Sequence, residues 1–320
     1  MLGSYRDIKF LIILLSFSFF SKLAAQETGS IFIRNTLSIY NPAFTGIDGP
    51  YVFFTTRSQW KGVDGAPRIN SLIYDLPQKK NVHLGFIAQN DKVFIENKTL
   101  FAVNYNYSLK LADNRFLFLA IKGGGFYNNI DINEIESKRI YDDYNPALSP
   151  VKSYFTPIFG LGMHYKAPNY FLGIGIPSLF KNKRFEDSKE LKTTATDYSY
   201  LHLSAGGKIK FKDIFTLNPT IIYRSIPTSP NILTTTLGIS YKEKFSLGGV
   251  YSSNENLGVF ITSKNKWGFE WGYGYEFTSS AISKVIKNPT HELMIRINLR
   301  KKAPPEQEED QTKQKQDEIQ

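Results

Sequence analysis

The sequence contains no cysteine, no long apolar run and only four histidines. Without cysteine the chain has no disulfides, and no lipid can be attached to a cysteine behind a signal peptide. The most apolar run, residues 10–20, is too short for a membrane-spanning helix, which needs about 20 residues. Long helical patterns are also nearly absent, whereas turn residues recur along the whole chain. These absences favour an all-β protein.

The amino terminus has the features of a secretory signal peptide. Arg6 and Lys9 precede the apolar run, and Ala24 and Ala25 offer small residues for cleavage. We therefore expect residues 1–25 to be removed near Ala25. The net charge of +10 is spread along an exported chain, so we expect no nucleic-acid partner.

Large and small side chains alternate with a period of two near the end of the sequence. The large ones are Trp267, Phe269, Trp271, Tyr273, Tyr275 and Phe277, and the positions between them hold Gly268, Glu270, Gly272, Gly274 and Glu276. The same period occurs in residues 99–111, 155–166 and 291–300. A period of two indicates extended strands with unlike faces.

Two folds produce such strands: a soluble β-sandwich with its apolar face inside, and a membrane barrel with its apolar face outside. The runs last ten residues or more, whereas soluble strands are most often about five or six residues long. About 9–11 tilted residues cross a bilayer. We therefore expect a barrel. Its lipid-facing aromatic residues are Trp267, Phe269, Trp271, Tyr273 and Tyr275, and its lumen-facing polar residues include Glu270, Glu276 and Arg296.

The predicted fold is a transmembrane antiparallel up-and-down β-barrel of about fourteen strands over residues 50–300. The predicted strands are 50–60, 68–76, 82–91, 98–111, 115–128, 155–167, 170–177, 198–211, 214–225, 230–241, 245–252, 256–263, 266–278 and 290–299. Very short connections fall only between an even-numbered strand and the next, and the longer loops 129–154 and 178–197 fall in the other set. Bacterial barrels have short periplasmic turns, so both termini are predicted to be periplasmic.

Two segments lie outside the predicted barrel. Residues 26–49 precede the first strand, and we expect them to plug the lumen or to lie beneath it. Residues 301–320 are charged and rich in glutamine, and we expect a solvated, disordered periplasmic tail.

Three stretches carry a resemblance to a known family. They are NPAFTG with Asn41, Pro42, Ala43 and Gly46; the run with Arg57, Gln59, Trp60, Gly62, Gly65, Ala66 and Pro67; and the late segment that begins His291-Glu292. Their order resembles the PorP/SprF family, outer-membrane proteins of the type IX secretion and gliding motility system of Bacteroidetes. The resemblance covers essentially the whole mature chain except the tail after Arg300.

The residues themselves indicate roles that are mainly structural. Asn-Pro and Thr-Gly favour a bend before the first strand. Arg57 cannot readily face lipid, so it is predicted to lie in the lumen, where Glu270 or Glu276 can pair with it. His291-Glu292 lacks the second histidine of a zinc-protease motif. We identify no catalytic, cofactor-binding or metal-binding residues.

The resemblance implies a non-enzymatic component of type IX secretion in the outer membrane. Family members either belong to the core apparatus with its periplasmic ring components, or assist secretion or surface attachment of a large adhesin. We favour the second role, with outer-membrane lipid and the C-terminal domain of a secreted adhesin as partners. The alternative is an outer-membrane channel for small solutes or fatty acids, because the width of a barrel grows with its strand number.

Overall fold

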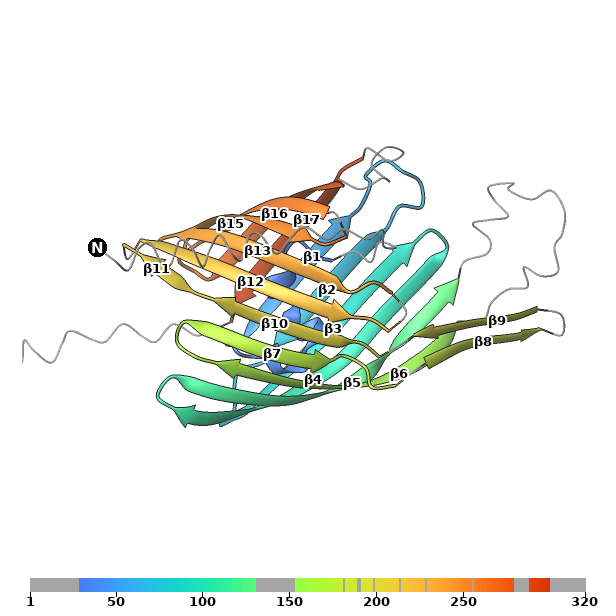
Figure 1. Ribbon diagram of the computed structural model, residues 1–320, viewed down its shortest axis with the longest axis horizontal. Helices are drawn as coiled ribbons and strands as arrows, with labels where there is room; N and C mark the ends of the chain where they lie inside the picture. The colour runs from blue at the N-terminus through green and yellow to red at the C-terminus, as the bar shows by residue number, and fades with distance from the viewer. Residues whose placement is uncertain are drawn as a thin grey trace, which may run out of the picture.

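Fourteen antiparallel strands close into one barrel in the computed structural model (Figure 1). The structure describes residues 29–130, 153–180, 182–188, 191–197, 199–212, 214–227, 229–254, 256–278 and 288–299. The predicted signal peptide, most of the loop 129–154 and the tail 301–320 lie outside these residues. The predicted fold class is confirmed, while the orientation of the termini stays a prediction.

The barrel strands follow one another in sequence order around the wall. They are β1 (Tyr51–Ser58), β2 (Arg68–Asp75), β3 (Val82–Val93), β4 (Glu96–Ala112), β5 (Arg115–Ile130), β6 (Tyr154–Lys166), β7 (Tyr170–Ile176), β10 (Leu201–Gly207) with β11 (Ile209–Phe211), β12 (Phe215–Ser225), β13 (Ile232–Tyr241), β14 (Phe245–Ser252), β15 (Asn256–Lys264), β16 (Phe269–Thr278) and β17 (Thr290–Asn298). Because β10 and β11 both pair with β12, we count them as one wall strand interrupted at Lys208.

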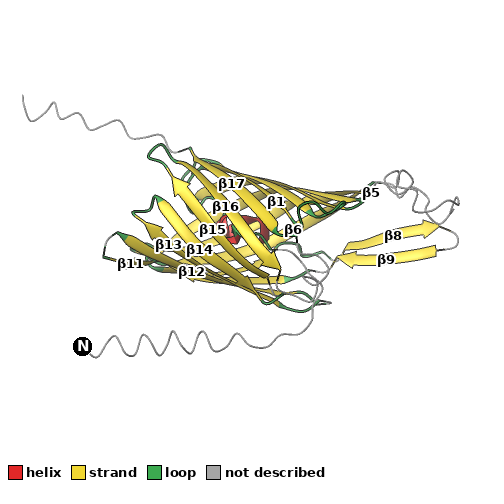
Figure 2. Cartoon of the chain, turned by 90° about the horizontal axis from the view of Figure 1, so that it is seen from above, coloured by secondary structure: helices red, strands yellow, loops and turns green. Residues whose placement is uncertain are grey.

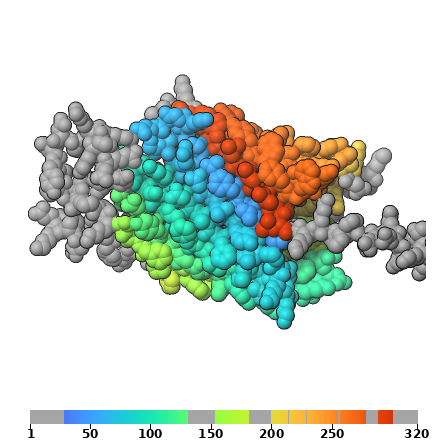
Figure 3. Space-filling model, turned by 180° about the vertical axis from the view of Figure 1, so that it is seen from behind, coloured from blue at the N-terminus to red at the C-terminus, as the bar shows by residue number. Residues whose placement is uncertain are grey.

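The wall closes because the last strand pairs with the first. β17 runs antiparallel to β1, from Tyr51 opposite Asn298 to Ser58 opposite His291. Figure 3 shows these two ends of the chain, blue and red, side by side on the outer surface. Each barrel strand therefore has a neighbour on both sides, which satisfies the backbone groups that lipid cannot satisfy.

The two faces of the wall differ as the alternating sequence predicts. On β4, Phe101, Val103 and Tyr105 are exposed on the outside, whereas Asn104 and Asn106 between them are fully buried inside. A β-sandwich would bury the apolar set instead. The outside is thus apolar and the inside largely polar, which is the arrangement of a membrane barrel.

The two ends of the barrel differ in their connections. At the end that we call the short-turn end, tight turns join the strands, and Lys80, Asn114, Lys212 and Lys242 adopt positive φ there. Longer connections lie at the opposite end, the long-loop end, between β5 and β6 and between β7 and β10. The prediction that very short connections fall only at one end is wrong for β3 and β4, because the two-residue turn Phe94-Ile95 joins them at the long-loop end.

Several of the predicted boundaries need correction. The strands predicted as 82–91 and 98–111 extend toward each other, to Val93 and from Glu96. The strand predicted from residue 266 begins at Phe269, because Gly268 has a φ of +88° and Trp267 lies in the turn. The strand 198–211 is interrupted at Lys208. The predicted loop 178–197 contains a separate hairpin of β8 (Asn182–Ser188) and β9 (Leu191–Asp197), which extends beyond the barrel wall (Figure 1).

Residues 29–49, which we call the inner segment, lie inside the barrel. They form η1 (Ile33–Asn35), α2 (Leu37–Tyr40) and η2 (Pro42–Phe44), and Figure 2 shows these short helices in red within the ring of strands. Ile31, Phe32, Ile33, Leu37 and Ile39 are buried there against apolar residues of the wall. Among the described residues, no helix has the length and apolarity needed to cross a membrane.

Candidate functional site

A buried carboxylate in the last strand holds the start of the inner segment. Glu292 Oε2 accepts a hydrogen bond of 2.7 Å from the backbone N–H of Ile31, and Oε1 accepts one from Ser30 Oγ. Thr55 Oγ1 of β1 donates to the same carboxylate at 3.1 Å. Since Glu292 is only 1% exposed, these donors replace the water that its charge would otherwise require.

Arg57 completes this cluster from the first strand. Its Nη2 lies 2.7 Å from Glu276 Oε1 and its Nη1 lies 3.3 Å from Glu292 Oε2. Arg57 and Glu276 are 1% and 4% exposed, so this is a buried ion-pair network. Removing one member of such a network typically costs about 3–5 kcal/mol, because an uncompensated buried charge remains. The cluster lies near the long-loop end and connects β1, β16, β17 and the inner segment.

From the sequence we expect Arg57 to pair with Glu270 or Glu276. The structure pairs Arg57 with Glu276 and, in addition, with Glu292. Glu270 lies at the other end of β16, opposite Arg296 of β17. The geometric reason is the register, which places Glu292 directly opposite Arg57 and Glu276 only two residues along β16 from Gly274, the residue opposite Glu292.

The NPAFTG stretch docks against the wall from within. Asn41 Nδ2 donates to the carbonyl oxygens of Met163 at 3.2 Å and Ile174 at 3.1 Å, and its Oδ1 accepts from Ala43 N at 3.0 Å, which caps η2. Pro42 begins this helix, where its missing N–H costs nothing. The asparagine thus fixes both the bend and its position on β6 and β7.

Glycines in β6 and β7 make room for Asn41. A β-carbon on Gly162 would lie 2.1 Å from Asn41 Oδ1, and one on Gly175 would lie 2.7 Å from Asn41 Cβ. No larger residue fits at either position without moving the inner segment. These two wall glycines are therefore explained by the close approach of Asn41.

Two asparagines and an aspartate hold the rest of this bend. Asn104 Nδ2 donates to Thr45 Oγ1 at 2.8 Å, and Asn106 Nδ2 donates to the carbonyl oxygen of Thr45 at 2.8 Å. The backbone N–H of Gly46 donates to Asp75 Oδ2 at 2.7 Å. All three wall side chains are fully buried, so they serve the inner segment rather than solvent.

The glycines of β16 also face the inner segment. A β-carbon on Gly274 would lie 2.8 Å from Ile31 Cδ1, and one on Gly272 would lie 3.0 Å from Phe32 Cε1. The small positions between the aromatic residues of this strand therefore leave space for Ile31 and Phe32. The opposite face of the strand carries exposed Trp271.

Cations and rings of the wall contact the middle of the inner segment. Lys122 Nζ donates to the carbonyl oxygen of Ile39, and Lys166 Nζ donates to that of Ile47 at 3.0 Å. The rings of Tyr40 and His202 stack with centroids 5.3 Å apart. Phe44 and His164 pack at 4.3 Å. The inner segment is thus bonded to the wall along its whole length.

The remaining predicted site residues occupy several places. Trp60, Gly62, Gly65, Ala66 and Pro67 lie in the connection between β1 and β2, where Trp60, Gly62 and Gly65 have positive φ. Gln59 is buried beside that connection, and its backbone N–H donates to the carbonyl oxygen of Pro67 at 2.9 Å. On the outer face, Phe269 and Trp271 are exposed and Tyr273 and Tyr275 are half-exposed, whereas Trp267 is exposed in the turn before β16. His291 also faces outward, with its Nδ1 2.7 Å from Tyr273 Oη.

Sequence reasoning missed the wall residues that bind the inner segment. Asn104, Asn106, Asp75 and Lys122 read as ordinary lumen-facing polar positions. The signal in the sequence that could have indicated these contacts is the presence of two asparagines, Asn104 and Asn106, on one face of a single strand. Among the described residues, no group of three His, Asp or Glu side chains is placed to hold a metal ion.

The fold and its interior define a β-barrel of the outer-membrane type whose lumen is occupied by its own amino-terminal segment. Hydrogen bonds join this segment to β2, β4, β5, β6, β7 and β17. The chain belongs to the family described as type IX secretion system membrane protein PorP/SprF, whose model matches residues 27–297. The match includes the inner segment and ends before the tail. The family recognised from the sequence is thereby confirmed.

The comparisons with solved structures show a similar fold only. None of the curated proteins matches the sequence significantly. Similar solved structures include the CymD monoaromatic hydrocarbon channel, with 11% identity, 84% of this chain and 93% of that chain covered, and a TM-score of 0.48. The Acinetobacter baumannii outer membrane protein Omp33 has 8% identity, 78% and 97% coverage, and a TM-score of 0.47. The KdgM porin has 8% identity, 78% and 99% coverage, and a TM-score of 0.35. Similarities this distant carry no argument about function.

Proposed function

We propose that this protein is a non-enzymatic component of type IX secretion that assists the secretion or surface attachment of a large adhesin-type cargo. Family membership supports a place in the secretion machinery and in the outer membrane. The finer role is our proposal. In it, the barrel is a membrane anchor that holds a partner rather than a pore that conducts one.

One observation carries this proposal: the inner segment occupies the lumen and is bonded to the wall from Ser30 to Ile47. Opening the lumen would break the Glu292 contacts, the Asn41 contacts and the hydrogen bonds from Asn104 and Asn106 together. A scaffold needs this rigidity, whereas a channel for a folded domain would have to lose it. The occupied lumen therefore favours a binding platform.

In this mechanism the partners bind at the two ends of the barrel. With the short turns in the periplasm, as bacterial barrels have them, the long-loop end faces the cell surface. The C-terminal domain of a secreted adhesin would bind there, where connecting loops provide variable contacts. Periplasmic ring components would approach the short-turn end.

Deletion of the gene followed by mass spectrometry of surface and culture-fluid proteins tests the proposal. We expect one or a few large adhesins to leave the cell surface, and complementation with the intact chain to restore them. An unchanged set of surface and secreted proteins would contradict the secretion role.

A channel for small solutes or fatty acids is the second candidate, and one observation favours it. Cavities of about 200 and 400 Å³ remain between the inner segment and the wall near the short-turn end. Liposome swelling separates the two functions. Solute flux through the purified protein together with unchanged secretion would support the channel, and absence of flux would support the anchor.

A further inference from the structure

A cleft lies between the inner segment and the wall at the short-turn end. Its two cavities, of about 200 and 400 Å³, share Arg34 and Asn218 as lining residues. The first is also lined by Ser246 and Glu270, close to two tight turns, and the second by Asn169 in the turn between β6 and β7. We call this space the short-turn cleft.

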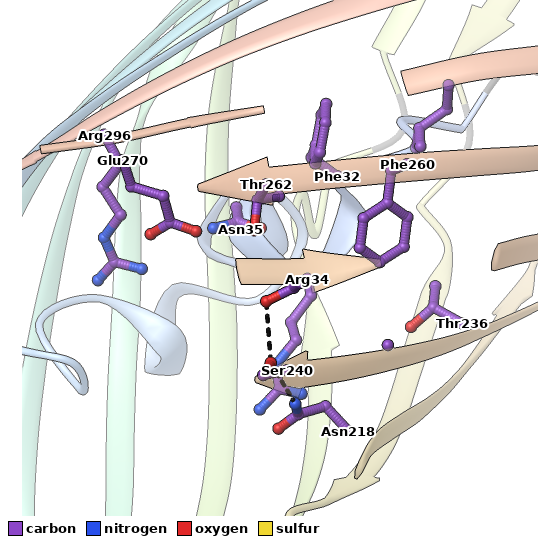
Figure 4. Close-up of a pocket in the computed structure, with 13 residues that line it drawn as sticks. Phe32, Arg34, Asn35, Asn218, Thr236, Ser240, Phe260, Thr262, Glu270 and Arg296 are labelled. Atoms are coloured by element: carbon purple, nitrogen blue, oxygen red, sulfur yellow. Dashed lines mark hydrogen bonds between the residues drawn. The ribbon is translucent and has the colours of Figure 1, made fainter. Parts of the chain in front are cut away.

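Arg34 is a cation of this cleft that makes no salt bridge with a described residue. It is exposed in the cleft, where Asp48 is its acidic neighbour, but no salt bridge joins the two side chains. Figure 4 shows Arg34 next to Asn218 and Ser240. Asn218 Nδ2 donates to Ser240 Oγ at 3.1 Å, and Ser240 and Ser246 share a hydrogen bond of 2.9 Å. A guanidinium beside hydroxyl and amide groups is suited to a carboxylate ligand.

The other charges of the cleft are already engaged. Arg296 lies 4.0 Å above the ring of Tyr51 and 3.8 Å from Asp48. Lys166 donates to a carbonyl oxygen of the inner segment, and Lys208 pairs at 2.7 Å with Glu243. The cleft is lined by four cations, Arg34, Arg296, Lys166 and Lys208, and by two carboxylates, Asp48 and Glu270, so its net charge is positive. Arg34 is the cation among the four without a salt bridge or a hydrogen bond to a described residue, and an acidic group can bind to it.

The carboxy-terminal part of the chain supplies an acidic segment at this same end. The backbone N–H of Leu299 donates to the carbonyl oxygen of Pro50 at 2.9 Å, so the chain leaves the barrel at the short-turn end. Four carboxylates follow within residues 306–310, which read EQEED. Glu306 is seven residues beyond Leu299, and seven extended residues reach up to about 24 Å. Arg296, which lines the cleft, is about 10 Å along the strand from Leu299, well within that reach.

We propose that residues 306–310 of the tail dock in the short-turn cleft, with Arg34 as the principal binding cation. The acidic run supplies the carboxylates, and Arg34, Asn218 and Ser240 supply donors. This inference goes beyond the proposed function and does not depend on it, because the occupant is part of the same chain. A docked tail would cover part of the short-turn end of the protein.

Cysteine cross-linking of the purified full-length protein in detergent micelles tests the docking. Because the natural chain has no cysteine, any disulfide must form between introduced cysteines. The test pair is Asn35→Cys, in the inner segment where it lines the cleft, with Glu308→Cys in the tail. The matched control is Lys61→Cys with Glu308→Cys, since Lys61 is exposed at the long-loop end. We expect an intramolecular disulfide with the test pair and little with the control.

Charge variants then separate specific docking from chance contact. Arg34→Gln in the test-pair background should lower the cross-link yield roughly five-fold, the equivalent of about 1 kcal/mol for a partly exposed ion pair. Arg34→Lys should retain most of the yield. Raising the salt to about 1 M, which shortens the screening length to about 3 Å, should lower it as well. Heat-modifiable gel mobility verifies that each variant is a folded barrel.

Three outcomes would overturn the proposal. Equal yields in the test and control pairs would mean that the tail does not prefer the cleft. A yield unchanged by Arg34→Gln would mean that Arg34 is not the binding cation. Cross-links only between different molecules would assign the acidic occupant to another chain.

Discussion

Replacing Glu292 by alanine should release the first part of the inner segment. The carboxylate accepts from Ser30, Ile31, Thr55 and Arg57, so its removal leaves the Ile31 N–H without this partner and Arg57 with only Glu276. Breaking a buried ion-pair network in this way costs about 3–5 kcal/mol. At about 1.4 kcal/mol for each factor of ten, even the lower figure raises the population of the released state roughly a hundred-fold.

Limited digestion with trypsin measures this release. The bond after Arg34 lies within the helix η1 inside the barrel, so the protease reaches it only after the segment has left the lumen. When opening is fast, the cleavage rate follows the population of the open state. We therefore expect the Glu292→Ala variant to be cut after Arg34 much faster than the unmodified protein, and Glu292→Gln to lie between the two.

The matched control is Glu270→Ala. Glu270 is a carboxylate on the luminal face of the wall, but no hydrogen bond joins it to the inner segment among the described contacts. Its variant should resist trypsin as the unmodified barrel does. If Glu292→Ala and Glu270→Ala were cut equally slowly, the anchoring role of Glu292 would be refuted.

Three further substitutions test other parts of the structure. Ile295→Arg places a cation on the outer face near mid-depth and should lower the free energy of unfolding by about 2–4 kcal/mol, measured by urea titration in lipid vesicles; an unchanged midpoint would contradict the assigned face. Asn41→Ala removes two hydrogen bonds to wall carbonyls and the cap of η2, which should cost about 1–3 kcal/mol in the same titration, and a loss below a few tenths would speak against the docking of this motif. Gly46→Ala should reduce the yield of folded barrel on heat-modifiable gels, because Gly46 has a φ of +74° and a β-carbon there would lie 2.6 Å from His83; a normal yield would mean that the bend adapts without strain.

Much of the barrel could be predicted from the sequence because each strand carries its own signal. The alternation in residues 99–111 or 291–300 fixes which side chains face outward, and the short turns fix which strands are neighbours. The same pattern wrongly placed Trp267 within the last but one strand. Gly268 continues the alternation of large and small residues, but the strand begins only after it because its φ is positive. The hairpin β8–β9 was missed because its polar residues lack a period of two.

The interior could not be predicted in the same way. The NPAFTG stretch predicts a bend, but it does not indicate which wall residues the bend contacts. In the sequence, Asn104 cannot be distinguished from other polar residues that face the lumen. The glycines at positions 162 and 175 have a reason only when Asn41 lies against them. A single sequence shows which residue types are present, whereas these contacts depend on pairs far apart in the chain.

The contact between Ser30 and Glu292 has a consequence for how the barrel is made. Ser30, at the start of the inner segment, is held by a residue of the last strand, which also completes the ring by pairing with β1. A chain truncated before β17 would lack both the pairing with β1 and the Glu292 contacts, while the contacts of Asn41 and Thr45 with β4, β6 and β7 do not involve that strand. Closure of the wall and attachment of the first residues of the inner segment therefore both depend on β17.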